Sequence, residues 1–186
     1  MHESNEMSCL IDLGTNGEIV IGNRDKLVCA STAAGPAFEG ACISGGMSAR
    51  SGALASIDYK AMPVNYHIIG NTEPEGICGS GLIDAVAWWL ECAQLDTWGL
   101  LNNEKQEVTI IKNLWLTQKD IREIQLAKGA IAAGIEILSQ QSGIRPDDIS
   151  RVFIAGAFGH FIDVANAKRI GLIPFDPDQV TKLGNS

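Results

Sequence analysis

One short stretch of the sequence combines a carboxylate with the residue types that bind phosphate. Asp12 ends an apolar run, and a polar turn with two glycines follows it, Gly14-Thr15-Asn16-Gly17-Glu18. Glycine lets the main chain approach phosphate oxygens, and Thr15 and Asn16 add side-chain donors. A carboxylate at position 12 can hold the water shell of Mg²⁺. The stretch therefore fits a phosphate and Mg²⁺ site, although an Asn-Gly hairpin on its own is more often only a hairpin.

A second glycine turn follows a late apolar run. Residues 151–155 predict a buried strand, and Gly156-Ala157-Phe158-Gly159 comes directly after it. Ligands of open α/β sheets bind at the carboxyl ends of strands, so this turn is a second candidate binding element. The alternative is a plain turn into a helix, with Phe158 in the core. Ser80 opens a buried helical run and is expected first as its cap, although a helix N-terminus can also face an anion.

The cysteines and histidines are too scattered to predict a metal site. The five cysteines are an odd number, and none lies within four residues of another: Cys9, Cys29, Cys42, Cys78 and Cys92. Zinc and iron-sulfur motifs need closer spacing. Cys9 and Cys29 lie in apolar strand-like runs and are expected to be small buried hydrophobes. Any redox cofactor would therefore lie elsewhere.

Three antiparallel strands are expected to position the first turn. Residues 9–13, 18–22 and 27–30 are apolar runs separated by turns, and Asn16-Gly17 suits a tight hairpin because both residue types tolerate a positive φ. The sequence up to Gly52 is then rich in glycine and alanine, which breaks regular structure and allows close backbone approach.

Helices are expected after these strands. Residues 82–93 are apolar almost all round, which predicts a buried helix. Thr117 and Asp120 form a capping box for the longest helix, whose apolar spacing continues until Gly143. A further helix should begin near Asp163. An edge strand is expected at residues 108–111. The order of helix, strand, glycine turn and helix indicates an α/β layer structure.

Composition narrows the class of protein. The 186 residues are 46% hydrophobic and 19% charged, which fits one globular domain and excludes a disordered chain. A formal charge of -8 repels phosphate backbones and anionic lipid, so neither nucleic acid nor a membrane is an expected partner. The polar start lacks the layout of a signal peptide, and a cytoplasmic location is expected.

The order of these elements resembles lobe II of the actin, Hsp70 and sugar-kinase ATPase superfamily. The resemblance implies an α/β fold, an actin-like (ribonuclease H-like) lobe whose mixed sheet starts with three antiparallel strands and is flanked by helices. It also implies an ATP site with Mg²⁺ held through water by Asp12, the one residue assigned a catalytic role. The other implied nucleotide-binding residues are Gly14, Thr15, Asn16, Gly17, Glu18, Glu39, Gly40, Ser80, Lys128, Gly156, Ala157 and Phe158. The superfamily often has two consecutive glycines where this chain has Gly156-Ala157, which puts the adenine contact there in doubt.

Four segments in order make the resemblance more specific. Residues 12–18, 76–84, 125–131 and 155–159 are similar to the carboxyl-terminal domain of reductive activators of corrinoid proteins. Members of that family also carry an amino-terminal [2Fe-2S] ferredoxin domain and a linker. They return cob(II)alamin of a corrinoid protein or methyltransferase to cob(I)alamin. The resemblance thus implies ATP-dependent activation of such a partner, with a homodimer as a further expectation.

The resemblance also implies that the chain is part of a larger protein. Residues 7–186 are expected to form one lobe, the second, of an actin-like ATPase domain, and residues 1–6 to be disordered or added to the natural sequence. This sequence has no ferredoxin cysteine spacing, and the resemblance implies a [2Fe-2S] cluster only in the absent amino-terminal domain. We expect activity only in the full-length protein, and weak ATP binding by the isolated chain.

Two other functions fit the same residues. An acyl or sugar kinase uses a similar nucleotide clamp but needs a substrate pocket that this lobe would not supply alone. A non-catalytic, actin-like interaction module would keep the hairpin for structure only. An upstream Cys-x4-Cys-x2-Cys pattern would favour the activator over both.

Overall fold

The computed structural model describes residue 1 and residues 3–184, except for the side chain of Ala157. The chain folds into two compact units. Unit 1 comprises Met1–Gly35 and Ala127–Ser186, and unit 2 comprises Pro36–Leu126. The expectation of one lobe over residues 7–186 stays a prediction. Among the described helices, none has the length and apolar character needed to cross a membrane.

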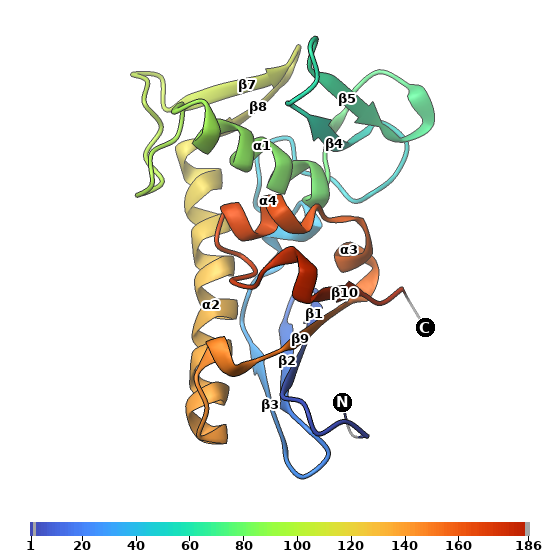
Figure 1. Cartoon of the computed structure of the whole chain (residues 1–186). Helices are drawn as coiled ribbons and strands as arrows, with labels where there is room; N and C mark the ends of the chain where they lie inside the picture. Colours follow the sequence, from blue (N-terminus) through green and yellow to red (C-terminus); the bar gives the residue numbers. More distant parts are fainter. Residues whose placement is uncertain (2, 185–186) are drawn as a thin grey trace. The chain divides into compact units, whose positions relative to one another are not determined.

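A five-stranded mixed sheet forms the centre of unit 1 (Figure 1). Its strands, in the spatial order β10-β9-β1-β2-β3, are β1 (Ser8–Leu13), β2 (Gly17–Gly22), β3 (Leu27–Thr32), β9 (Arg151–Ala155) and β10 (Val180–Lys182). The first three strands pair antiparallel, β9 is parallel to β1, and β10 is parallel to β9. The antiparallel start and the late buried strand are confirmed. β10 was not predicted, because three residues that include Thr181 and Lys182 carry no apolar signal.

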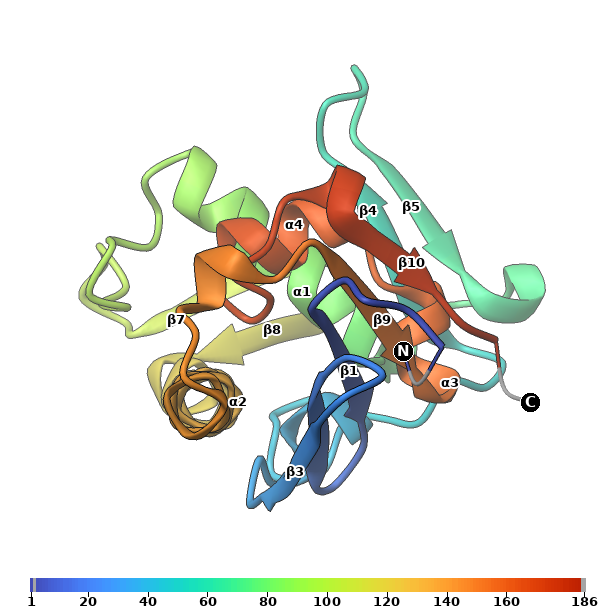
Figure 2. The same ribbon diagram turned by 60° about the horizontal axis from the view of Figure 1, so that its bottom comes forward.

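One face of this sheet carries the core of unit 1. Strand alternation places Ile11, Ile19 and Ile154 on that face, and all three are fully buried. The helix α2 (Gln118–Ser142) packs there, since a Cβ added to Gly134 would lie 2.7 Å from Ile19 Cδ1. Figure 2 views α2 nearly along its axis, with the strands of unit 1 to one side of it.

The opposite face of the sheet is less covered. Leu10, Val20 and Phe153 face that side and are half-buried, and Cys29 at the same level of β3 is exposed. The expectation that Cys29 is buried is therefore wrong. β3 is an edge strand, and Cys29 points away from the face on which α2 packs.

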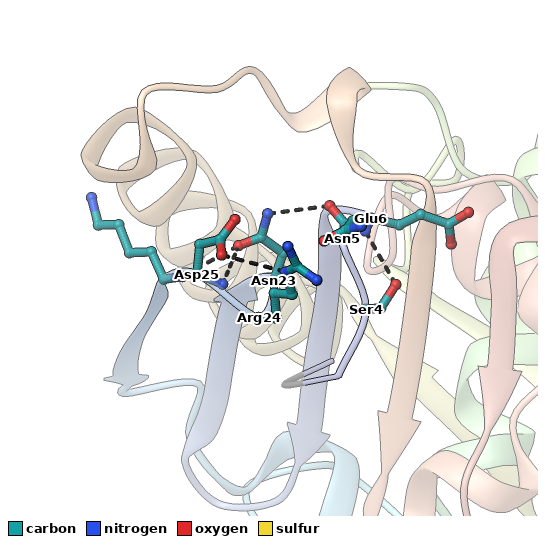
Figure 3. Close-up of polar contacts among 7 residues, drawn as sticks. Ser4, Asn5, Glu6, Asn23, Arg24 and Asp25 are labelled. Atoms are coloured by element: carbon teal, nitrogen blue, oxygen red, sulfur yellow. Dashed lines mark hydrogen bonds and ion pairs between the residues drawn. The ribbon is translucent and has the colours of Figure 1, made fainter.

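The start of the chain contacts the turn between β2 and β3, as Figure 3 shows. Arg24 N donates to the carbonyl of Ser4 at 2.8 Å, and Asn23 Nδ2 donates to the carbonyl of Asn5 at 3.2 Å. The carboxylate of Glu6 pairs with Arg151 Nε at 2.7 Å. These contacts anchor residues 4–6 on unit 1, and the expected origin of residues 1–6 stays a prediction.

Unit 2 combines small sheets with a buried helix. Its strands are β4 (Ala53–Asp58), β5 (Asn65–Ile68) and β6 (Gly76–Ile77) in one sheet, and β7 (Glu107–Ile111) and β8 (Leu114–Thr117) in a hairpin. The helix α1 (Gly79–Glu91) is buried on nearly all sides, which confirms the buried helix. Its Asp84 accepts a hydrogen bond from Ile57 N at 3.0 Å. The edge strand at 108–111 is also confirmed, whereas β4 and β8 were not predicted.

The remaining helices are short. Unit 1 contains α3 (Gly156–Phe161) and α4 (Val164–Arg169). Single 3-10 turns occupy Pro36–Glu39, Ile69–Asn71, Pro146–Asp148 and Pro177–Gln179.

The predicted capping box starts α2. The buried carboxylate of Asp120 accepts hydrogen bonds from Thr117 N at 2.7 Å and from Thr117 Oγ1 at 2.8 Å, and its second oxygen accepts from Ser44 N at 2.8 Å. Thr117 Oγ1 in turn lies 3.3 Å from Asp120 N. Gly143, with φ +72°, follows the last turn as predicted.

Candidate functional site

The two glycine turns are neighbours in unit 1. β1 and β9 are parallel, and Asp12 pairs with Ala155, so both strands end at the same edge of the sheet. A Cβ added to Gly156 would lie only 2.5 Å from Asp12 Oδ1. Figure 1 shows β9 leading into α3 beside β1. Two segments far apart in the sequence thus bring a carboxylate and a glycine turn together at the carboxyl ends of two strands.

A second carboxylate faces the same side of the sheet. Asp12 is half-buried and lies opposite Glu18 across the β1–β2 hairpin, so their side chains project to one face. Glu18 is exposed and accepts a hydrogen bond from Ser31 Oγ at 3.3 Å. Neighbouring carboxylates supply the oxygen ligands that Mg²⁺ prefers, and Mg²⁺ commonly takes one or two of them together with water and phosphate. Within the described part of the chain, no three His, Cys, Asp or Glu side chains converge as a metal cage.

The loop after Asp12 is short and open to solvent. Leu13 pairs with Gly17, which leaves the exposed residues 14–16 as the connection. Gly14 N donates to the carbonyl of Asn16 at 3.1 Å. The Gly14 amide is thus bonded within the loop, and the exposed residues 14–16 lie at the end of β1, where the sequence predicted a phosphate nest.

The sequence suggested that Asn16 and Gly17 are present because the hairpin needs a positive φ, and this expectation is wrong. Neither residue has a positive φ. Gly17 is a buried residue of β2, and a Cβ there would lie 2.1 Å from Ile131 Cδ1 of α2. Glycine is needed at position 17 because the helix packs closely against it, and the phosphate role of Gly17 stays a prediction.

The turn after β9 is tighter than expected. Gly156 has φ +84°, and α3 begins at Gly156 itself instead of after a longer turn. The helix expected near Asp163 is confirmed as α4, and the carboxylate of Asp163 accepts a hydrogen bond from Asn166 N at 2.8 Å. Phe158 is half-buried, and the side chain of Ala157 lies outside the described atoms. The nucleoside roles of these residues stay predictions.

Lys128 contacts the end of α4. Its Nζ donates to the carbonyl of Ile170 at 2.7 Å, and Ile170 is the residue that ends this helix. Partial burial lowers the pKa of Lys128 from its ordinary value. A positive charge at the carboxyl end of a helix is favourable, so Lys128 has a structural partner besides its predicted role toward the nucleoside.

The other predicted residues lie in unit 2. Glu39 is exposed at the end of a 3-10 turn. Gly40 has φ +85°, and a Cβ there would lie 2.5 Å from Met47 N, which confirms the close backbone approach expected in this region. Ser80 is buried, and its hydroxyl donates to the carbonyl of Ala55 at 2.7 Å. Ser80 is not the cap of α1, because Cys78 occupies that position. The nucleotide roles of Glu39, Gly40 and Ser80 stay predictions.

The cysteines are free thiols in two environments. Cys9 and Cys78 are buried, whereas Cys29, Cys42 and Cys92 are exposed. Burial raises the pKa of the Cys9 thiol to about 12, so this thiol stays protonated and unreactive at neutral pH. The expectation that Cys9 acts as a small buried hydrophobe is confirmed.

Comparisons with known proteins identify relatives along almost the whole chain. Residues 6–186 match the family described as the C-terminal domain of RACo, the ASKHA domain. The corrinoid activation enzyme RamQ of Eubacterium limosum is 40% identical over an alignment that covers 97% of this chain and 35% of RamQ. The Co(II) methylated amine-specific corrinoid protein reductase of Methanosarcina barkeri is 32% identical, covering 97% of this chain and 37% of the reductase.

A solved structure agrees with these sequence matches. The reductive activator for corrinoid, iron-sulfur protein superposes with a TM-score of 0.87 and 35% identity, over 98% of this chain and 32% of the activator. The chain spans about a third of the length of each of these relatives. It therefore belongs to the family of RACo C-terminal domains and has their ASKHA fold, that of actin-like ATPases.

Proposed function

We propose that this chain is the ATP-binding portion of a reductive activator that returns the cob(II)alamin of a corrinoid protein to cob(I)alamin. Family membership supports the activator, because the relatives are named for corrinoid activation or reduction. The ATP site is supported by the close approach of the Asp12 carboxylate to the turn at Gly156, at the ends of two paired strands. Those relatives also favour an activator over an acyl or sugar kinase.

The residues at this edge suit a nucleotide with Mg²⁺. Asp12 would hold Mg²⁺ through water, with Glu18 beside it on the same face. The exposed loop at residues 14–16 would hold phosphate oxygens with backbone and side-chain donors. Bound Mg-ATP supplies negative charge and a bond whose hydrolysis can drive a conformational change. Catalysis at such sites consists of positioning and charge stabilisation, which a rigid sheet edge provides.

The partner of the whole protein would be a corrinoid protein or a corrinoid-dependent methyltransferase, in the cytoplasm. The electron would come from a [2Fe-2S] cluster in a separate domain of the full-length protein, which is a further proposal together with the homodimer. ATP can favour electron transfer only if it binds one conformation of the activator and its partner more tightly than another. A nucleotide site that closes around phosphates supplies such a difference.

The central test changes Asp12 in the full-length protein. Asp12→Asn removes the charge that would hold Mg²⁺, so ATP-dependent reduction of cob(II)alamin should fall by about 100-fold or more while the cluster spectrum stays unchanged. Asp25→Asn is the matched control, because Asp25 is an exposed aspartate in the turn between β2 and β3. Unchanged ATP dependence in Asp12→Asn would remove Asp12 from the site.

The isolated chain offers a separate test of affinity. We expect it to fold and to bind Mg-ATP weakly, because the resemblance implies a clamp formed by two lobes. Calorimetry should therefore give a dissociation constant well above the micromolar range. A micromolar value for the chain alone would show that the other lobe of the clamp is not needed for binding.

A further inference from the structure

We infer that Gly156 is a positioning residue for Asp12: the missing side chain at position 156 leaves the space in which the Asp12 carboxylate lies. This inference rests on the proposed function, because it assigns the use of that carboxylate to Mg-ATP. It differs from the role that the resemblance implies for Gly156, a direct contact with the nucleoside.

The distances around Gly156 support this assignment. A Cβ at position 156 would lie 2.5 Å from Asp12 Oδ1 and 3.3 Å from the carbonyl oxygen of Leu13. A carbon and an oxygen atom that are not bonded cannot lie 2.5 Å apart, so either Asp12 Oδ1 or the new Cβ at position 156 must move. The Leu13 carbonyl is part of β1 and is fixed by the sheet, whereas the carboxylate is the free end of a side chain. An alanine at position 156 would therefore displace the Asp12 carboxylate and leave the strand in place.

The parallel pairing of β1 and β9 explains why residue 156 lies close enough to Asp12 to fix the position of its carboxylate. Asp12 and Ala155 are paired, so the residue after Ala155 comes directly beside the end of β1. Mg²⁺ demands near-ideal ligand geometry, and a small displacement of a ligand, or of the water that the ligand orients, lowers affinity. Mutation of a group that orients a metal ligand typically lowers metal affinity or activity by about 10-fold to 100-fold. The turn after β9 thus sets the position of a side chain on β1.

The structural test uses two glycines with similar positive φ angles. Gly156 has φ +84° and Gly143 has φ +72°, but nothing lies within 4 Å of a Cβ at position 143. Gly143→Ala therefore measures the backbone strain of a left-handed residue alone. Crystal structures of the two alanine variants of the chain should show the Asp12 side chain in a new rotamer in Gly156→Ala and in its original rotamer in Gly143→Ala. An unmoved Asp12 carboxylate in Gly156→Ala would overturn the inference.

A further variant keeps this test decisive if Gly156→Ala does not fold. Adding Asp12→Ala removes the carboxylate, so the double variant should recover the melting temperature of Gly143→Ala to within a few degrees, about 2–4 °C. Failure to recover would mean that the space at position 156 serves another group, and the inference would be wrong.

Mg-ATP binding by the full-length protein separates positioning from direct contact. If Gly156 acts through Asp12, Gly156→Ala should weaken binding by about 10-fold to 100-fold, and the double variant with Asp12→Asn should bind no more weakly than Asp12→Asn alone. Losses that multiply in the double variant would indicate a direct contact and overturn the inference. Equal Mg-ATP binding by the wild type and Asp12→Asn would instead refute the proposed function, while the rotamer of Asp12 still decides the role of Gly156.

Discussion

Single residues at the end of β1 show what local sequence can and cannot predict. Asp12 and the polar loop after it were predicted as a candidate site from residue types alone, and the register of the hairpin places Glu18 opposite Asp12. The contact with Gly156 depends on parallel pairing of strands that lie far apart in the sequence, which no local pattern encodes. At Gly17 the residue type suggested a turn, but the structure shows that glycine is required there because Ile131 packs against it.

Lys128 gives a pH-dependent prediction at this scale. Burial lowers the pKa of Lys128 below its ordinary value of 10.5, so the unfolded chain holds this proton more tightly than the folded chain. Between the two pKa values the unfolded state binds more protons, and the contribution of Lys128 to stability rises as the pH rises toward 10.5. The free energy of unfolding of the wild type should therefore increase relative to that of Lys128→Met over this range.

Denaturant unfolding at several pH values checks this dependence. Lys105→Met, which changes an exposed lysine in a loop, should keep the same slope with pH as the wild type. A wild type and Lys128→Met with parallel pH profiles would show that burial does not perturb Lys128.

At the scale of elements, strong periodicity and caps predicted most of the framework. The strands β1, β2, β3 and β9 and the helices α1 and α2 follow from apolar runs and helical spacing. The missed elements are short or carry weak signals: β4, β8, β10 and α3. The helix α3 has six residues and two glycines, so it is too short to be stable alone and depends on its contacts with β1 and β9.

The capping box of α2 gives a prediction at this scale. Asp120→Ala should lower the free energy of unfolding by about 2–3 kcal/mol, because it removes the carboxylate that accepts from Thr117 N, Thr117 Oγ1 and Ser44 N. Glu136→Ala is the control, since Glu136 is exposed later on the same helix and bonds only to Gln140 among the contacts described here. A loss in Asp120→Ala no larger than that in the control would show that the cap contributes little.

For the whole molecule, the fold was predicted from the family resemblance as much as from the patterns of residues. Composition and periodicity indicate an α/β layer structure, and the match over residues 6–186 makes it an ASKHA domain. The division into two compact units could not be predicted, because it depends on which elements contact one another. Ser80, Lys128 and Gly40 have structural contacts of their own, and Glu39 is exposed; their nucleotide roles stay predictions.

We expect the loop after Asp12 and the turn at Gly156 to bind one nucleotide. The most direct measurement is an NMR titration of the ¹⁵N-labelled chain with Mg-ATP, followed at the backbone amides and extended to millimolar nucleotide because weak binding is expected. The amides of residues 14–17 and of Gly156 should shift together along one binding curve, and AMP, which lacks the β- and γ-phosphates, should shift the loop after Asp12 much less. Shifts confined to other residues, or separate curves for the two turns, would contradict this expectation.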